Sequence, residues 1–456
     1  MKTMSQQQRK QMMLAEPVNK IIPRLAVPSI ISMLITAIYN MADTFFVSQI
    51  GTSASGAVGV IFSAMAIIQA VAFMIGMGSG TNVSQALGAG DGEKAKRYAA
   101  TGFFTAFIVG VIIMLLGLSS IDPLVRFLGA TETIAPYARD YAQYIFFGAP
   151  FIMCSFAMNN LLRFEGLAFY GMIGITSGGI LNMVLDPILI FGFGMGTAGA
   201  ALATAISQAV SFAILLLMTN TKPDAIKISI KNFRPTLEMY GKIVNNGFPS
   251  LGRQGIASVA TIILNTTAGA YGDAAIAAMA IVSRFVMFIN STVIGIGQGF
   301  QPVCSFSFGA KKYARVREAF FFCLKVTTVL LAVLALCSFF LSEQIVTVFR
   351  RDDPQVIAIG TLAMRLQILT LPLWGFIVMS NMLTQSIGYG IRATIISTAR
   401  QGLFLIPSLL TLPRMFGLLG LQMAQPTSDA LSCVLTFLIV RSILRDLKRK
   451  EKQLEN

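Results

Sequence analysis

Long apolar runs separated by short polar segments fill most of the chain. An uninterrupted apolar run of about 18 residues or more is typical of a helix that crosses a membrane. By this criterion the sequence predicts twelve spans, at 24–48, 55–83, 95–118, 135–162, 168–192, 197–219, 243–270, 274–305, 316–340, 355–386, 393–413 and 419–443. We therefore expect an all-α polytopic membrane protein with twelve transmembrane helices.

Composition supports this class and argues against others. Of the 456 residues, 55% are hydrophobic and 12% are charged, whereas a soluble domain carries about 25% charged residues. The net charge of +15 does not indicate a nucleic-acid partner, because the basic residues lie in short loops between spans. The chain has no histidine and its five cysteines form no CxxC pair, so we expect no metal site, no other cofactor and no enzymatic centre.

Basic residues gather in alternate loops. They precede the first span, follow the second and eighth, fill the loop between the sixth and seventh, and form the tail. The opposite loops hold few, namely Arg126, the Arg350-Arg351 pair and Arg414. Because positive loops stay inside, we expect both termini to be cytoplasmic in a multi-pass protein of the cell membrane. The segment from Met1 to Lys20 is polar and lacks the apolar core of a cleavable signal.

The second half of the chain repeats the first. At an offset of 221 residues Pro28-Ser29 matches Pro249-Ser250, Gly76 matches Gly297, Gly78 matches Gly299 and Gly88 matches Gly309, and at an offset of 222 Asn159 matches Asn381. Since each half begins and ends on one side, these are parallel repeats about an axis along the membrane normal. We expect six-helix lobes at 21–219 and 243–443, a cytoplasmic linker at 220–242, and terminal segments at 1–20 and 444–456. Two such lobes around a cleft are typical of alternating-access transporters.

Asp186 places a carboxylate inside an apolar span. A charge at bilayer depth costs about 2.5–3.5 kcal/mol on insertion scales, so buried acids there usually serve a function. Asn182 lies on the same helix face, and Pro187 leaves the carbonyl of Met183 without its helical donor. This combination suggests a proton or cation site, and the alternative is an aspartate that only ties two helices together.

Other polar residues are predicted to lie at the same depth in the membrane as Asp186. Asp43, Asp186 and Thr204 each lie about 10–12 Å below the outer surface, at about 1.5 Å per helical residue. Two acids removed from water at one depth should not both be ionised, which suits reversible proton loading. A sodium ion held by Asp43, Asn182, Asp186 and Thr204 is the second reading. If Asp43 and Asp186 lie on faces that never meet, no shared site exists.

Other polar residues within spans are further candidates. Glu165, at the inner end of the fourth span, either takes part in coupling or forms a surface pair with Arg163. Asn159 and Asn160 sit higher in that helix, where they can line the cleft or bond within the lobe. Asn40 shares the face of Asp43 and is assigned, with Asn159 and Asn160, to substrate binding.

The first span and the methionines bear on movement and substrate range. Pro28 can kink its helix, and we expect this helix to bend when the acids change protonation. The chain holds 24 methionines. Flexible side chains such as Met33 suit a site for varied lipophilic ligands, although most methionines individually pack against neighbours.

The second half carries basic rather than acidic residues within its spans. We expect no acid beside Arg253, Arg284, Arg365 and Arg400, so these side chains should face water or the cleft. Arg284, near mid-depth, is the candidate for substrate contact. The positions matching Asp43, Glu165 and Asp186 are Leu264, Ile387 and Ile406, so the functional carboxylates are expected only in the first lobe.

Distinctive motifs lie in Pro28-Ser29 and in 40–47, 163–166, 182–187 and 196–201. Through these motifs the chain resembles, over essentially its whole length, the multidrug and toxic compound extrusion family, in its DinF-like or MepA-like branch. The resemblance implies proton- or sodium-driven antiport of lipophilic, often cationic compounds. We expect the protein to act as a monomer that contacts membrane lipids. The resemblance also implies coupling roles for Asp43, Glu165, Asn182, Asp186 and Thr204. A lipid or polysaccharide-precursor flippase of the same fold is the alternative, which the second-lobe arginines keep open.

Overall fold

The computed structural model describes residues 6–223, 225–349 and 353–455, and these are almost entirely helical, with no strand among them. The first lobe comprises α2 (Val18–Ser48), α3 (Thr52–Ala89), α4 (Gly92–Ser119), α6 (Ala135–Phe164), α7 (Ala168–Pro187) and α8 (Gly196–Thr221). The second comprises α9 (Leu237–Gly269), α10 (Asp273–Gly309), α11 (Tyr313–Phe340), α13 (Pro354–Leu369), α14 (Leu371–Ser386), α15 (Gly390–Thr398), α16 (Leu405–Phe416) and α17 (Leu418–Glu455). Each predicted span coincides with one of these helices or with a broken pair, so the predicted fold class is confirmed. The Arg350-Arg351 pair lies outside the described residues.

Two of the twelve predicted spans are less apolar than the others. Among the described residues, nine helices are long and apolar enough to cross a membrane, or ten if α13 and α14 form one span bent by 51°. The remaining two, α9 and α17, have 33 and 38 residues, and both carry charged side chains within their length. Both are long enough to cross a membrane, and some of their polar residues, such as Asn246 on α9 and Asp429 on α17, are buried within the protein.

Several shorter elements are absent from the sequence prediction. These are α1 (Gln6–Ala15), α5 (Ile121–Phe127), α12 (Ser342–Phe349), the 3-10 helix η2 (Ile230–Asn232), and the π-helical segments η1 (Ile188–Gly192) and η3 (Ala399–Phe404). Helices α5 and α12 follow the third helix of their respective lobes, as the internal repeat requires. Helix α9 begins within the predicted linker, and α17 continues through the predicted tail.

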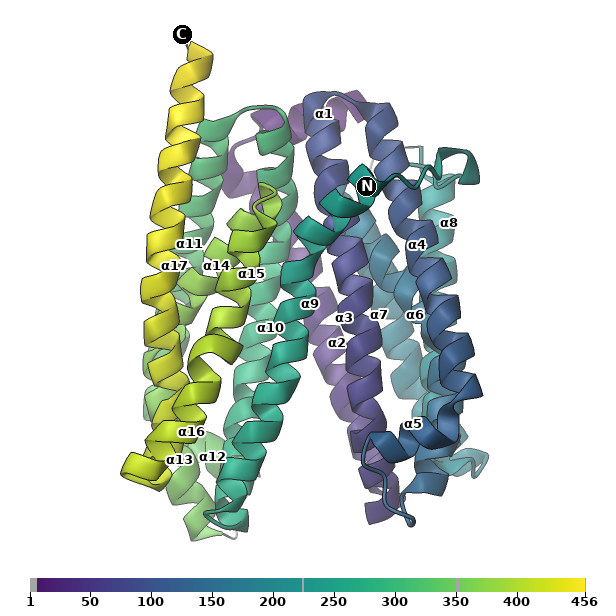
Figure 1. Cartoon of the computed structure of the whole chain (residues 1–456), viewed down its shortest axis with the longest axis vertical. Coiled ribbons are helices and arrows are strands. Elements are labelled where there is room, and N and C mark those ends of the chain that lie inside the picture. Colours follow the sequence, from purple (N-terminus) through teal and green to yellow (C-terminus); the bar gives the residue numbers. More distant parts are fainter. Residues whose placement is uncertain (1–5, 224, 350–352, 456) are drawn as a thin grey trace.

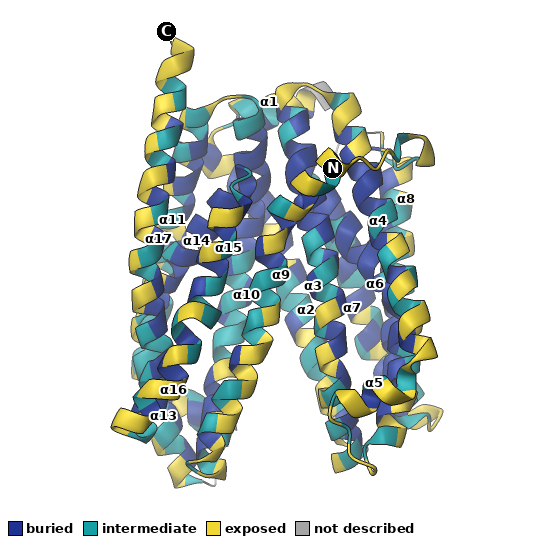
Figure 2. Cartoon of the chain, in the orientation of Figure 1, coloured by how far each residue is buried: buried dark blue, intermediate teal, exposed yellow. Residues whose placement is uncertain are grey.

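The two lobes diverge from the end of the molecule that carries α1 and the C-terminus (Figure 1). Buried residues concentrate within each arm and where the arms meet (Figure 2). Gly88 and Gly309 explain how closely the lobes approach at that junction. A Cβ at Gly88 would lie 2.1 Å from the carbonyl oxygen of Phe306, and one at Gly309 would lie 2.0 Å from that of Gln85. The sequence repeat pairs these two glycines, and the structure shows that each accommodates the opposite lobe.

Pro28 is buried within α2, as expected of a proline in the first span. The inner half of this helix packs on the second lobe, since Val18, Ile21 and Leu25 belong to the same apolar core as residues of α10 and α11. Helix α2 therefore belongs to the first lobe and also contacts the second. A bend in this helix would change the position of one lobe relative to the other. The expected bending at Pro28 stays a prediction.

Candidate functional site

Three helices of the first lobe bring the predicted polar residues together. The side-chain amide of Asn182 donates hydrogen bonds to Asp186 Oδ1 and to Thr204 Oγ1, each over 3.3 Å. Asn182 and Asp186 stand four residues apart on α7, so one helix face presents both, and Thr204 meets them from α8. Asp186 is fully buried. The predicted grouping of these three residues is thus seen in the geometry.

Asp43 joins this group from α2. Its carboxyl group lies near the Tyr141 hydroxyl and close enough to Asp186 for the two charges to interact. Tyr141 is fully buried on α6, and its hydroxyl also lies 3.7 Å from the sulfur of Met65. The two aspartates therefore lie near each other, and their shared role in coupling stays a prediction. We call Asp43, Tyr141, Asn182, Asp186 and Thr204 the acidic cluster.

The sequence reasoning missed two tyrosines near Asp43. Tyr141 stands six residues after the first residue of α6, at the outer end of the fourth span and hence at the depth of the acids. Tyr39 stands four residues before Asp43 on the same face of α2, is buried, and lies close to it. The depth count that found Thr204 would have found Tyr141 had it included phenols.

Three oxygen atoms of the acidic cluster are buried without a hydrogen-bond donor. Within the described part of the chain, Asp43 Oδ1, Asp186 Oδ2 and Asn182 Oδ1 accept nothing. A buried acceptor left unpaired costs about 1–3 kcal/mol, and more when it is charged. Protons on the carboxyls would relieve this cost, and so would a hard cation such as sodium, which prefers oxygen ligands of this kind. The donor set therefore fits either coupling ion.

The backbone next to the cluster is irregular. Helix α7 ends at Pro187 and continues as the π-helical segment η1. Short π-helical segments are frequent at functional sites because they leave carbonyl groups without their usual helical donor. Pro187, which was expected to leave the Met183 carbonyl without its helical donor, thus stands at the change from α-helix to π-helix.

Glu165 lies away from the acidic cluster. It follows the last residue of α6, 24 residues beyond Tyr141, or about 36 Å along the helix at about 1.5 Å per residue. It is 1% exposed, accepts a 2.9 Å hydrogen bond from the Ile226 backbone N–H of the linker, and lies 3.8 Å from Arg9 of α1. The expected surface pair with Arg163 is wrong. Glu165 instead fastens α1 and the linker to the end of α6, and its position does not support a direct share in the cluster.

The asparagines assigned to substrate binding serve the packing of the first lobe. Asn160 is fully buried, donates to the Phe156 carbonyl over 2.7 Å, and accepts from Arg163. Asn159 packs against α7, where a Cβ on Gly171 would lie 2.8 Å from its amide nitrogen. Asn160 therefore follows the alternative of bonding within the lobe, and Asn159 packs there without a side-chain hydrogen bond to any described residue.

Asn40 and Arg284 likewise stand apart from the central cavity. Asn40 is partly buried on α2 and its carbonyl oxygen accepts from the Thr44 hydroxyl. Arg284 is exposed on α10 and is absent from the residues that line the cavity between the lobes. Of the five predicted substrate contacts, Met33 alone lies in that lining, where its sulfur is 3.6 Å from the Gln298 amide nitrogen.

The cavity between the lobes has a volume of about 330 Å³. The first lobe contributes a mainly apolar wall, and the second contributes amides and the only two charged residues of the lining, Arg253 and Arg400. The lining comprises Met33, Thr36, Gln69, Phe73, Phe156, Arg253, Gln254, Ala257, Asn290, Ile294, Gln298, Trp374, Ile377, Val378, Asn381, Ile396, Ser397, Arg400 and Gln401.

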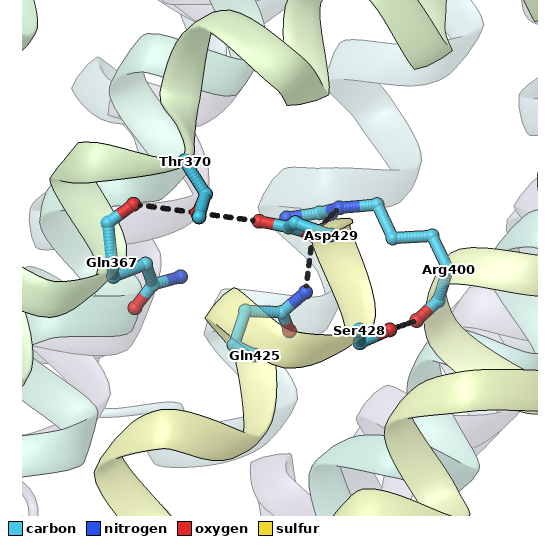
Figure 3. Close-up of polar contacts among 6 residues, drawn as sticks. All are labelled: Gln367, Thr370, Arg400, Gln425, Ser428 and Asp429. Carbon is cyan, nitrogen blue, oxygen red and sulfur yellow. Dashed lines mark hydrogen bonds and ion pairs between the residues drawn. The ribbon is translucent and has the colours of Figure 1, made fainter. Parts of the chain in front are cut away.

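The second lobe contains a buried carboxylate that the sequence reasoning overlooked. Asp429 on α17 is 2% exposed. Its carboxylate accepts hydrogen bonds from Arg400 Nε over 2.6 Å, from the Gln425 amide over 2.9 Å and from the Thr370 hydroxyl over 3.0 Å (Figure 3). The guanidinium of Arg400, held in η3, also lies 5.3 Å from the centre of the Trp374 ring. The expectation that Arg400 lacks an acidic neighbour, and that the acids are confined to the first lobe, is therefore wrong.

Duplicated six-helix lobes around a central cavity, with ionisable groups buried at membrane depth, define a polytopic membrane transporter. A family model described as MatE matches residues 28–188 and 249–410, once in each half. The chain belongs to the MatE family, and the resemblance noted from the sequence motifs is confirmed.

Curated relatives and a solved structure agree with this assignment. The chain is 29% identical to the multidrug export protein MepA of Staphylococcus saprophyticus over 422 residues, which cover 92% of this chain and 93% of that protein. It is also 29% identical to MepA of Staphylococcus aureus strain MSSA476 over 433 residues, covering 94% and 95% respectively. A structure described as the outward-facing conformation of a multidrug resistance MATE family transporter superposes with a TM-score of 0.92, at 27% identity, over 98% of this chain and 100% of that one.

Proposed function

We propose that this protein is a secondary active efflux transporter, which exports small lipophilic compounds across the cell membrane in exchange for a proton or a sodium ion. The acidic cluster carries the proposal, because Asp43, Asp186 and Asn182 hold buried oxygens that lack a donor. Such a site gains free energy by taking up a small cation. The relatives named multidrug export proteins support the export of drug-like compounds.

Alternating access supplies the mechanism that this arrangement suits. The lobes diverge away from the end that carries α1 (Figure 1), and cytoplasmic termini would make that opening external. Asp43 lies in the outer part of α2, so a cation entering from outside would reach the cluster. Coupling then requires that cation and substrate differ in affinity between the two facing states. Because one chain supplies both lobes, we propose that a monomer is sufficient.

The lining of the cavity bears on the substrate. It holds Arg253 and Arg400 and no acidic side chain, so it does not favour the cationic compounds that the family resemblance implied. The relatives, in turn, do not favour the flippase alternative. We therefore propose a drug-like lipophilic substrate.

Substrate-triggered ion release from purified protein tests the exchange directly. In weakly buffered detergent solution, addition of a transported compound should release protons, or bound sodium in a sodium-loaded sample. Asp43→Asn and Asp186→Asn should bind the compound without release. Equal release from both variants, or binding without release in the native protein, would contradict the proposed exchange.

A further inference from the structure

We propose that the central cavity takes a lipophilic anion, in which an apolar body carries a carboxylate, sulfonate or phosphate group held by Arg253 beside Arg400. This inference deepens the proposed transport function and rests on it for the statement that the anion is exported. The binding step itself depends only on the cavity.

The first argument is the charge on the cavity wall. The guanidinium of Arg253 makes no hydrogen bond, ion pair or aromatic contact with any residue in 6–223, 225–349 and 353–455. Arg400 is neutralised by Asp429 behind it, so the described lining retains one net positive charge. Asp43 and Asp186 do not belong to this lining and provide no compensation within it.

The second argument is a neighbouring arginine that also lacks an acid. Arg163, on α6, is 2% exposed, and its Nε and Nη1 atoms have no acceptor among the described residues. It lies close enough to Arg253 on α9 for the two positive charges to repel. Uncompensated guanidinium groups at membrane depth are costly. An anion bound at Arg253 would offset that repulsion, whereas a cation would add to it.

The third argument is the polarity of the opposing walls. Met33, Phe73 and Phe156 come from the first lobe, while Arg253, Asn290 and Gln298 come from the second. An amphipathic molecule would place its apolar body against the first lobe and its charged group against the second, where amide donors surround it. Guanidinium groups bind oxyanions through two parallel hydrogen bonds, which favours carboxylate, sulfonate or phosphate. The volume of about 330 Å³ suits a small amphiphile.

The chain contains its own reporter for this site. Trp374 is the only tryptophan of the sequence and lines the cavity beside Arg400. Its intrinsic fluorescence in purified protein should therefore change on occupancy, with no label required. Tetraphenylborate and tetraphenylphosphonium serve as probes, because they share size and shape and differ in the sign of their charge.

We expect Trp374 to report tetraphenylborate binding at least about tenfold tighter than tetraphenylphosphonium binding. Arg253→Gln should weaken tetraphenylborate binding by about tenfold or more, because it removes the net positive charge of the described lining, and Arg253→Lys should weaken it by less, because lysine keeps that charge. Arg284→Gln is the matched control, because Arg284 is exposed and outside the lining. Comparison of variants in the same micelles cancels the partitioning of the probes into detergent.

Competition identifies the source of the anion. Displacement of tetraphenylborate by laurate but not by phosphatidylglycerol indicates a free organic anion, and displacement by phosphatidylglycerol indicates a lipid headgroup. Equal affinity for the two tetraphenyl ions, a preference for the phosphonium, or an unchanged preference in a folded Arg253→Gln protein overturns the proposal. Because the titration uses no ion gradient, it can succeed while gradient-driven export fails, and it can fail while export persists.

Discussion

Asp186 in the first lobe keeps a buried carboxylate oxygen without a donor, whereas both oxygens of Asp429 in the second lobe accept hydrogen bonds and one faces an arginine. The two residues lie in lobes of the same fold and at similarly low exposure. Burial alone therefore does not distinguish a group that exchanges an ion from one that holds helices together. The number of unpaired acceptor atoms does, because only an unpaired acceptor gains by binding a proton or cation.

Removal of Asp429 should give the largest loss of stability. Asp429→Asn leaves Arg400 without its counter-charge, and breaking a buried pair costs about 3–5 kcal/mol. The thermal unfolding midpoint of the purified protein should fall accordingly. The double variant with Arg400→Gln should recover a substantial part of that loss, since neither charge is then left buried alone. A stable single variant, or a double variant no better than the single, would show that the pair is not structural.

Substitution of Tyr141 in the acidic cluster should have an effect of intermediate size. Tyr141→Phe removes a hydroxyl that lies near the Asp43 carboxyl, and a hydrogen bond from this hydroxyl to the charged carboxylate would contribute about 1.5–3 kcal/mol. We expect efflux in vesicles to fall by about tenfold and its dependence on pH or sodium to shift, with little change in stability. Tyr144→Phe, on the same helix, is the control. A normal ion dependence in Tyr141→Phe would remove this residue from the cluster.

Glu165 should give the smallest effect. Glu165→Gln keeps an acceptor for the Ile226 N–H but loses the charge facing Arg9, which lies 3.8 Å away. We expect the efflux rate to fall by less than about tenfold, with an unchanged dependence on the ion gradient, because Glu165 lies outside the acidic cluster. Measurement of the efflux rate of this variant at several ion gradients separates a structural effect on the rate from an effect on ion coupling. A changed ion dependence would return Glu165 to the coupling residues.

Much of the fold could be predicted from the sequence because apolar length and loop charge act locally along the chain. The depth of Asp43, Asp186 and Thr204 followed from counting helical residues, and that was enough to place them together. The internal repeat also paired Gly88 with Gly309, which the structure shows at the junction of the lobes.

The errors arose where a neighbour comes from a distant segment. Asp429 escaped notice because only the first-lobe acids were traced to their repeat partners, and its contact with Arg400 joins α17 to η3. Glu165 meets α1 and the linker, whose positions no periodicity predicts. Asn159 and Asn160 were placed on the correct helix, but sequence spacing does not say which face of that helix meets the cavity.

Dye efflux in inverted membrane vesicles, with imposed proton or sodium gradients, tests the central claim most directly. The native protein should move dye when one of the gradients is applied and should stop when that gradient is collapsed. Asp43→Asn and Asp186→Asn should reduce this movement to background although both proteins insert and remain folded. Gradient-driven efflux retained in both variants would contradict the assignment of ion coupling to the acidic cluster.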